Sequence, residues 1–182
     1  LSAAQTAAEE AGMGVGVLAD LAVGVGKASA ETWLMGDVYA SGITVGAPPD
    51  QYNQGGQDWG QPPWNPLRLE ELEYEPFRAM VRAALSRVGG LRIDHIIGLF
   101  RLWWVPEGLG PSAGTYVRYN HEAMVGILAL EAYRAQALVV GEDLGTVEPW
   151  VREYLARRGL LGTAILWWEY GSDGQVLPPE EW

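Results

Sequence analysis

Two carboxylates, Asp94 and Glu142, are the residues best placed to do chemistry, because each follows a short apolar run. The runs 91–95 and 138–143 are consecutive predicted strands, so the two carboxylates lie at the carboxyl ends of neighbouring strands. Neighbouring strands in a sheet are about 4.8 Å apart. A separation of about 5 Å is typical of retaining glycosidases, in which one carboxylate is the nucleophile and the other the general acid and base.

Two further charged residues accompany this pair. Arg92 precedes Asp94 by two positions, so the two side chains point to the same face of the strand. A guanidinium there would keep Asp94 ionised and oriented, although an ordinary ion pair of little energetic value is the alternative. Asp20 ends an earlier β-rich run, 14–20. A single carboxylate could be a loop residue or a helix cap, but three at strand ends favour a site.

Helix patterns alternate with the short strand patterns along the chain. The helices are predicted at 2–11, 76–88, 121–136 and 149–158, and the strands at 14–20, 91–95, 138–143 and 163–169. Short apolar strands that alternate with helices indicate a parallel α/β sheet. A (β/α)8 barrel and an open doubly wound sheet both fit this order. We expect the tryptophans of 163–169, Trp167 and Trp168, to pack in the core or the wall of the sheet.

The segment 36–66 is rich in glycine, proline, asparagine, aspartate and glutamine, and it is predicted to be a long irregular loop. Loops of this length in a compact domain are usually functional. Trp59 lies in this segment without a periodic apolar pattern around it, so it is a candidate for stacking on a sugar ring rather than for core packing.

Composition narrows the choice of partners. The formal net charge is -11, which would repel nucleic acid and anionic membranes. No apolar run is long enough to cross a bilayer. The chain has no cysteine, which excludes disulfides and thiolate metal sites and favours a cytoplasmic protein. No ligand spacing typical of a metal site is recognisable, so none is expected.

Four motifs, in order along the chain, carry a resemblance to a known family. They are VLADLAVGVG at 17–26, GAPPDQYNQGGQDWGQPPW at 46–64, LRIDHIIGLFRLWWVPEG at 91–108 and GEDLGTV at 141–147. Together they resemble the amylomaltases, the bacterial 4-α-glucanotransferases. The first motif departs modestly from the family, with Ala19 in place of a glycine and Ala22 in place of a proline.

The resemblance implies a role for each site residue. Asp94 matches the nucleophile, Glu142 the general acid and base, and Arg92 the arginine beside the nucleophile. The remaining residues match positions that contact the substrate or belong to the substrate loop: Asp20, His95, Tyr52, Gln57 and Trp59. The family uses a (β/α)8 barrel, needs no organic cofactor, and moves α-1,4-glucan segments from a maltooligosaccharide donor to the 4-hydroxyl of an acceptor sugar.

The resemblance also indicates that the chain is incomplete. The family has a third essential carboxylate in a His-Asp pair on a later strand, and this sequence contains no such pair. A full barrel needs eight strands and usually about 250 residues. We therefore expect 1–182 to be the middle of a catalytic barrel domain without either end, and we expect it to be inactive alone.

Two other functions remain open at this stage. A retaining α-glucan hydrolase of the α-amylase type would use the same carboxylates, and product analysis would distinguish it. A non-catalytic glucan-binding domain with tryptophan platforms would usually be a small β-sandwich, which does not fit the α/β pattern.

Overall fold

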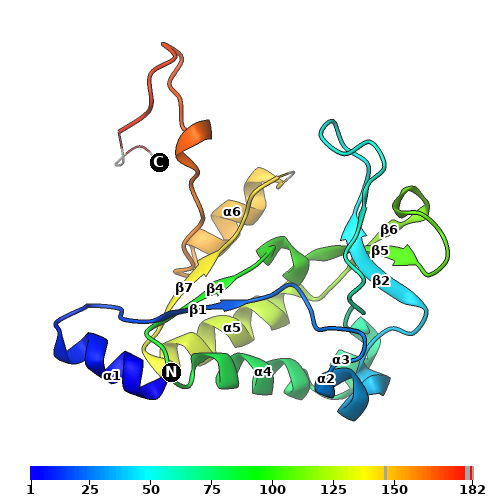
Figure 1. The fold of residues 1–182 in the computed structure, drawn as a ribbon, viewed down its shortest axis with the longest axis horizontal. Helices are drawn as coiled ribbons and strands as arrows, with labels where there is room; N and C mark the ends of the chain where they lie inside the picture. Colours follow the sequence, from blue (N-terminus) through cyan, green and yellow to red (C-terminus); the bar gives the residue numbers. More distant parts are fainter. Residues whose placement is uncertain (146, 179–180, 182) are drawn as a thin grey trace.

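The computed structural model describes residues 1–145, 147–178 and 181, and its centre is a three-stranded parallel sheet (Figure 1). The strands are β1 (Leu18–Leu21), β4 (Gly90–Ile93) and β7 (Leu138–Gly141), in the order β1-β4-β7. Gly90 pairs with Leu18 on one side and with Leu138 on the other, so the three strands run in step. Three of the four predicted strands are therefore confirmed, and they lie side by side.

The four predicted helices are also present, with boundaries shifted by a few residues. They are α1 (Ser2–Glu10), α4 (Glu75–Leu85), α5 (His121–Ala135) and α6 (Pro149–Ala156). The side chain of Asn120 caps α5 by accepting a hydrogen bond from the main-chain NH of Ala123 at 3.1 Å. Proline occupies the first turn of both α4 and α6, where its missing NH costs nothing.

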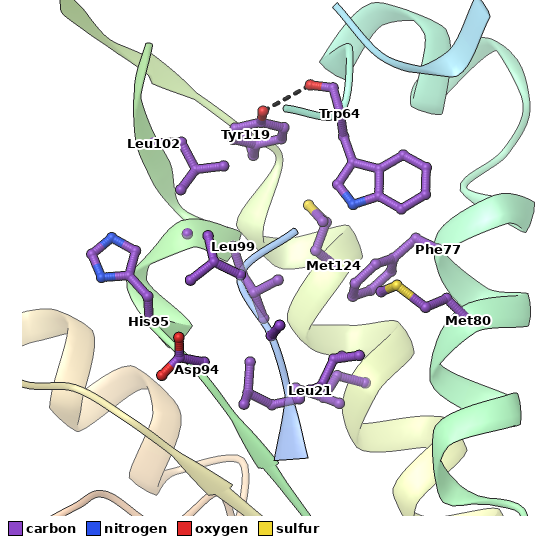
Figure 2. Close-up of a pocket in the computed structure, with 15 residues that line it drawn as sticks. Leu21, Trp64, Phe77, Met80, Asp94, His95, Leu99, Leu102, Tyr119 and Met124 are labelled. Atoms are coloured by element: carbon purple, nitrogen blue, oxygen red, sulfur yellow. Dashed lines mark hydrogen bonds between the residues drawn. The ribbon is translucent and has the colours of Figure 1, made fainter. Parts of the chain in front are cut away.

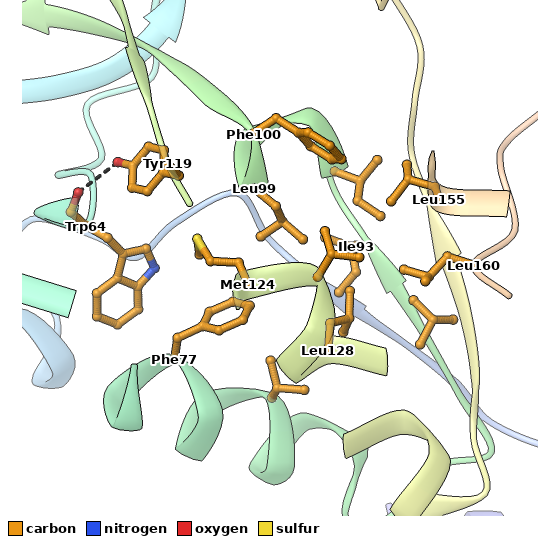
Figure 3. Close-up of a cluster of buried hydrophobic side chains, with 14 of the residues drawn as sticks. Trp64, Phe77, Ile93, Leu99, Phe100, Tyr119, Met124, Leu128, Leu155 and Leu160 are labelled. Carbon is orange, nitrogen blue, oxygen red and sulfur yellow. Dashed lines mark hydrogen bonds between the residues drawn. The ribbon is translucent and has the colours of Figure 1, made fainter. Parts of the chain in front are cut away.

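The core forms where α4 and α5 pack against the parallel sheet (Figure 3). On α4 the buried side chains are Phe77, Val81 and Leu85, at the spacing of one helix face. They meet Met124 and Leu128 of α5, and Figure 3 shows Phe77, Met124 and Leu128 gathered between the two helices. Burial of these apolar side chains holds the strands, and thus the residues at the strand ends, in place.

A second sheet, antiparallel, corrects the prediction of an irregular loop at 36–66. It contains β2 (Ile43–Ala47), β3 (Gln57–Asp58), β5 (Arg101–Pro106) and β6 (Thr115–Arg118), in the order β3-β2-β5-β6. The loop prediction was wrong for 43–47 and 57–58 because the partner of β2 is β5, which is far away in the sequence. A pairing of this kind leaves little local signal beside so many glycines and prolines.

The remaining regular elements are short and connect the larger ones. They are α2 (Ala30–Leu34), α3 (Pro66–Glu71) and four 3-10 turns: η1 (Gly36–Val38), η2 (Ile96–Leu99), η3 (Pro111–Ala113) and η4 (Leu166–Trp168). Of these, η2 is important for the site, because it begins directly after Asp94 and His95, the two residues that follow β4.

The predicted strand at 163–169 was wrong. Residues 166–168 form η4, and among the described residues the sheet continues beyond β7 as a single bridge, between Val140 and Leu161. Trp167 and Trp168 are exposed rather than packed in the core or in the wall of a sheet. The segment 163–169 contains several apolar residues, but strand structure also needs a partner to satisfy the main-chain groups. The described chain is thus a mixed α/β structure with one parallel and one antiparallel sheet.

Candidate active site

The two candidate catalytic carboxylates lie next to each other in the parallel sheet. Asp94 directly follows β4 and Glu142 directly follows β7, and the last paired residues of these strands are Ile93 and Gly141. The main-chain NH of Glu142 donates to the carbonyl of Ile93 at 2.8 Å, and that of Asp94 donates to the carbonyl of Leu21 at 2.9 Å. Both residues therefore extend the main-chain hydrogen bonding of the sheet by one residue. They lie together at the carboxyl ends of their strands, as the sequence predicted.

Main-chain donors hold the carboxylate of Glu142. Its Oε2 accepts a hydrogen bond from the NH of His95 at 3.0 Å, and its Oε1 accepts one from the NH of Leu144 at 3.0 Å. A side chain held at both oxygens has little rotational freedom. Glu142 is therefore oriented before any ligand arrives, which is a requirement for proton transfer in a fixed geometry.

Asp94 is oriented by a guanidinium that it shares with another carboxylate. Nη2 of Arg92 lies 2.9 Å from Oδ1 of Asp94, and Nη1 lies 2.7 Å from Oδ1 of Asp20. Asp20 and Arg92 are paired residues of β1 and β4, so the sheet register itself brings them together. The bond to Asp20, more than the bond to Asp94, raises the pKa of Arg92 above its usual range. The arginine thus stays charged and holds Asp94 in one orientation.

His95 links the two carboxylates to the aromatic wall of the site. Its backbone adopts a left-handed conformation with φ of 49°, and its NH donates to Oε2 of Glu142. Its ring meets the ring of Trp59 edge to face, with 5.4 Å between centroids. Burial lowers the pKa of the imidazole below its ordinary value, against the opposing effect of Glu142 and Asp94. At neutral pH the ring is therefore uncharged and can accept or donate a hydrogen bond.

These side chains surround an open pocket of about 320 Å³. Its lining is Ala22, Val23, Trp59, Gln61, Asp94, His95 and Glu142. The pocket combines two carboxylates, an indole and an amide. Such a lining suits a neutral ligand that has several hydroxyl groups and an apolar face.

Behind Asp94 and His95 lies a second, mainly apolar cavity (Figure 2). In Figure 2 the two polar side chains lie on one side, and Phe77, Met80 and Trp64 lie on the other. The hydroxyl of Tyr119 donates to the carbonyl of Trp64 at 2.7 Å. This apolar layer keeps water away from the back of the site and makes the charges in front of it more effective.

The structure places the predicted loop residues at different distances from the pocket. Trp59 lines it, as does His95. Gln57 lies in β3 and accepts a hydrogen bond from Nε1 of Trp59 at 3.0 Å, so it supports the indole rather than lining the pocket. Tyr52 is 90% exposed on the connection between β2 and β3 and does not line the pocket. Asp20 does not line the pocket and is connected to the site through its bond with Arg92.

Three pocket residues were not among the predicted site residues: Ala22, Val23 and Gln61. For Gln61 a signal existed, because it follows Trp59 by two positions, and residues two apart in an extended segment point to the same side. Thr146, within the predicted motif at 141–147, lies outside the described residues.

Within residues 1–145, 147–178 and 181, no group of three or more histidine, aspartate or glutamate side chains could hold a metal ion. No described helix is long and apolar enough to cross a membrane.

Comparison with known proteins gives a consistent result. Residues 1–182 match the family described as 4-alpha-glucanotransferase. A 4-alpha-glucanotransferase of Mycobacterium tuberculosis is 63% identical over 186 residues, which cover 100% of this chain and 26% of that protein. The enzyme of the same name from Haemophilus influenzae is 44% identical over 152 residues, 84% of this chain and 22% of that protein.

Two solved structures have the same fold as this chain. The amylomaltase of Corynebacterium glutamicum superimposes with a TM-score of 0.91 at 54% identity, over 97% of this chain and 25% of that one. The amylomaltase of Streptococcus agalactiae, solved in complex with acarbose, has a TM-score of 0.80 at 20% identity, over 94% of this chain and 35% of that one. The chain therefore spans 22% to 35% of the length of these relatives.

Proposed function

The chain belongs to the 4-alpha-glucanotransferase family, and on that basis we propose that the complete protein transfers α-1,4-glucan segments from a maltooligosaccharide to the 4-hydroxyl of an acceptor sugar. The observation that carries the proposal is the placement of Asp94 and Glu142 at the ends of adjacent parallel strands, each oriented by hydrogen-bond donors, in one open pocket.

The reaction is a double displacement with retention of configuration. A carboxylate oxygen of Asp94 attacks the anomeric carbon of the donor while Glu142, protonated, gives its proton to the departing glycosidic oxygen. The bond to that oxygen breaks and a covalent glycosyl ester forms on Asp94. The 4-hydroxyl of the acceptor then attacks the anomeric carbon, Glu142 takes the hydroxyl proton, and the ester bond to Asp94 breaks. Atoms and charge balance over the two steps.

Arg92 and His95 support this chemistry. Arg92 holds Asp94 with one oxygen bound and leaves the other free for attack. His95 binds Glu142 through its main chain, and its ring, on the wall of the pocket, is available to a sugar hydroxyl. The indole of Trp59 offers a flat apolar surface to a pyranose ring. Gln57 supports the indole, and Tyr52 is proposed to reach the glucan only at its outer end.

We also propose that β1, β4 and β7 are consecutive strands of a (β/α)8 barrel. Their parallel order and the packing of α4 and α5 on one face support this assignment. In such barrels the catalytic side chains come from the carboxyl ends of the strands, where Asp94 and Glu142 lie. The family's third carboxylate would then come from a strand outside this sequence. The cysteine-free composition supports a cytoplasmic location, which fractionation of the native cells would test.

Incubation of maltotriose with the protein expressed from the complete reading frame tests the function. Transfer gives glucose together with oligosaccharides longer than the substrate. Glucose and maltose without longer products would instead show a hydrolase, and would contradict the proposed acceptor. The absence of any product would contradict the enzyme function as a whole.

A further inference from the structure

Gln61 lies in the wall of the pocket, yet nothing in the mechanism uses it. The residue follows β3 and Trp59, and its main-chain carbonyl accepts a hydrogen bond from the NH of Val45 in β2 at 2.7 Å. This bond fixes the backbone of Gln61 against the antiparallel sheet. The side chain lines the same pocket as Asp94 and Glu142.

The amide of Gln61 lacks a partner for its oxygen. Within the described residues, Oε1 is buried and accepts no hydrogen bond. The side chain packs over the backbone of Gly24, where an added Cβ would lie 3.2 Å from Oε1. A buried acceptor without a donor costs free energy that an apolar side chain of the same size would not. Unsatisfied polar groups of this kind in a native protein call for an explanation.

We propose that the amide of Gln61 binds a hydroxyl group of the donor sugar and thereby helps to select it, an inference that rests on the proposed function. A glutamine amide offers one acceptor and two donors, and a sugar hydroxyl both donates and accepts. Rotation of the amide about its terminal side-chain bond exchanges the two ends, so a hydroxyl can satisfy it in either orientation.

The charges and shape of the pocket favour a neutral sugar as this ligand. Asp94 and Glu142 would repel an anion, and Arg92 is already bound to two carboxylates. Trp59 and Gln61 are two positions apart and both line the pocket, so one segment presents a stacking surface and a hydrogen-bonding group together. Stacking recognises the ring, whereas the amide recognises the position of one hydroxyl.

The first test replaces Gln61 by methionine in the protein expressed from the complete reading frame. Methionine has a similar length but no hydrogen-bonding amide. We expect kcat/KM for maltotriose to fall about tenfold or more, because the hydroxyl loses its partner in a desolvated site. The matched control is the same change at Gln175, which is exposed, and kcat/KM should not change there. An unchanged kcat/KM in Gln61→Met would overturn the proposal.

The second test identifies the bond itself. Donors that each lack one hydroxyl of the sugar bound beside Asp94 are compared in the wild-type protein and in Gln61→Met. In the wild type we expect one deoxy donor to have a lower kcat/KM than the intact donor. In Gln61→Met the same deoxy donor should have the same kcat/KM as the intact donor, because the amide that binds this hydroxyl is already absent. If every deoxy donor loses as much in the variant as in the wild type, Gln61 makes no such bond.

Stability separates a binding role from a structural one. Without substrate, Gln61→Met should unfold at the same temperature as the wild type or higher, because it removes an unpaired buried acceptor. A lower unfolding temperature would show that the amide supports the fold and would contradict the proposal. Failure of the proposed function is distinguishable, since the wild type itself would then give no products longer than maltotriose.

Discussion

The main-chain NH of His95 donates a hydrogen bond to Oε2 of Glu142 at 3.0 Å. His95 is the residue directly after Asp94, so the carboxylate of Glu142 is bound to the peptide unit that follows the candidate nucleophile. The backbone therefore fixes the carboxylate of Glu142 relative to residue 95, while the side chain of Arg92 orients Asp94. A fixed spacing matters, because the separation of the carboxyl groups decides the stereochemistry of glycoside chemistry.

Removing either carboxylate should stop turnover in distinguishable ways. For Asp94→Asn and Glu142→Gln we expect kcat with maltotriose to fall by a factor of about 1,000 or more. With a maltosyl fluoride donor, whose leaving group needs no proton, Glu142→Gln should regain its first step and Asp94→Asn should not. Release of fluoride measures this step. Glu10→Gln on α1 is the exposed control. Near-normal maltotriose turnover in either variant would refute the assignment.

The shared guanidinium predicts an effect of Arg92→Lys. A lysine keeps the charge but presents a single ammonium group, which does not reproduce the forked geometry between Asp20 and Asp94. We expect kcat to fall by a factor of about 10 to 100 with a smaller change in KM, because orientation of the nucleophile is lost. Arg78→Lys, in the pair with Glu75 on α4, is the control and should leave kcat unchanged. Equal rates in both variants would show that Arg92 has no orienting role.

Gly141 allows the close packing that brings His95 to Glu142. A Cβ at this position would collide with the side chain of Ile96 in η2. Gly141→Ala should displace η2 and reduce the free energy of unfolding by about 1–3 kcal/mol, the usual cost of overpacking. Denaturant unfolding measures this change. Gly126→Ala in α5 has open space around it and should not destabilise the protein, because alanine is the better helix former. A stable Gly141→Ala variant would show that Ile96 can move aside.

The lowered pKa of His95 predicts a loss of stability in acid. Since burial favours the neutral ring in the folded state, the unfolded state binds more protons once the pH falls below about 6.5, the ordinary value for histidine. Stability is therefore fully present above that pH and declines as the pH falls toward the lowered value. His95→Asn, which tolerates the left-handed backbone, should flatten this decline. Thermal unfolding at about pH 7.5 and about pH 5.5 tests it, and an unchanged slope would assign the decline to other groups.

The sequence by itself determined the helices and the parallel strands that carry the site. Apolar periodicity and a first-turn proline placed α4, a first-turn proline also marks α6, and a long, mostly apolar segment placed α5. The runs before Asp94 and Glu142 placed β4 and β7. These signals are local, because they arise from the way one segment buries its own apolar face. The spacing of Arg92 and Asp94 likewise predicted their ion pair, which is a property of one strand.

Only the tertiary structure decided the features that depend on distant partners. The pairing of β2 with β5, the bond from Arg92 to Asp20 and the entry of Gln61 into the pocket each join segments far apart in the chain. In the segment 163–169 the local signal was misleading. Its apolar pattern predicted a strand, but next to β7 the described residues form a single bridge, between Val140 and Leu161. The physical reason is the same in each case: strands and sites need hydrogen-bonding partners that no single segment contains.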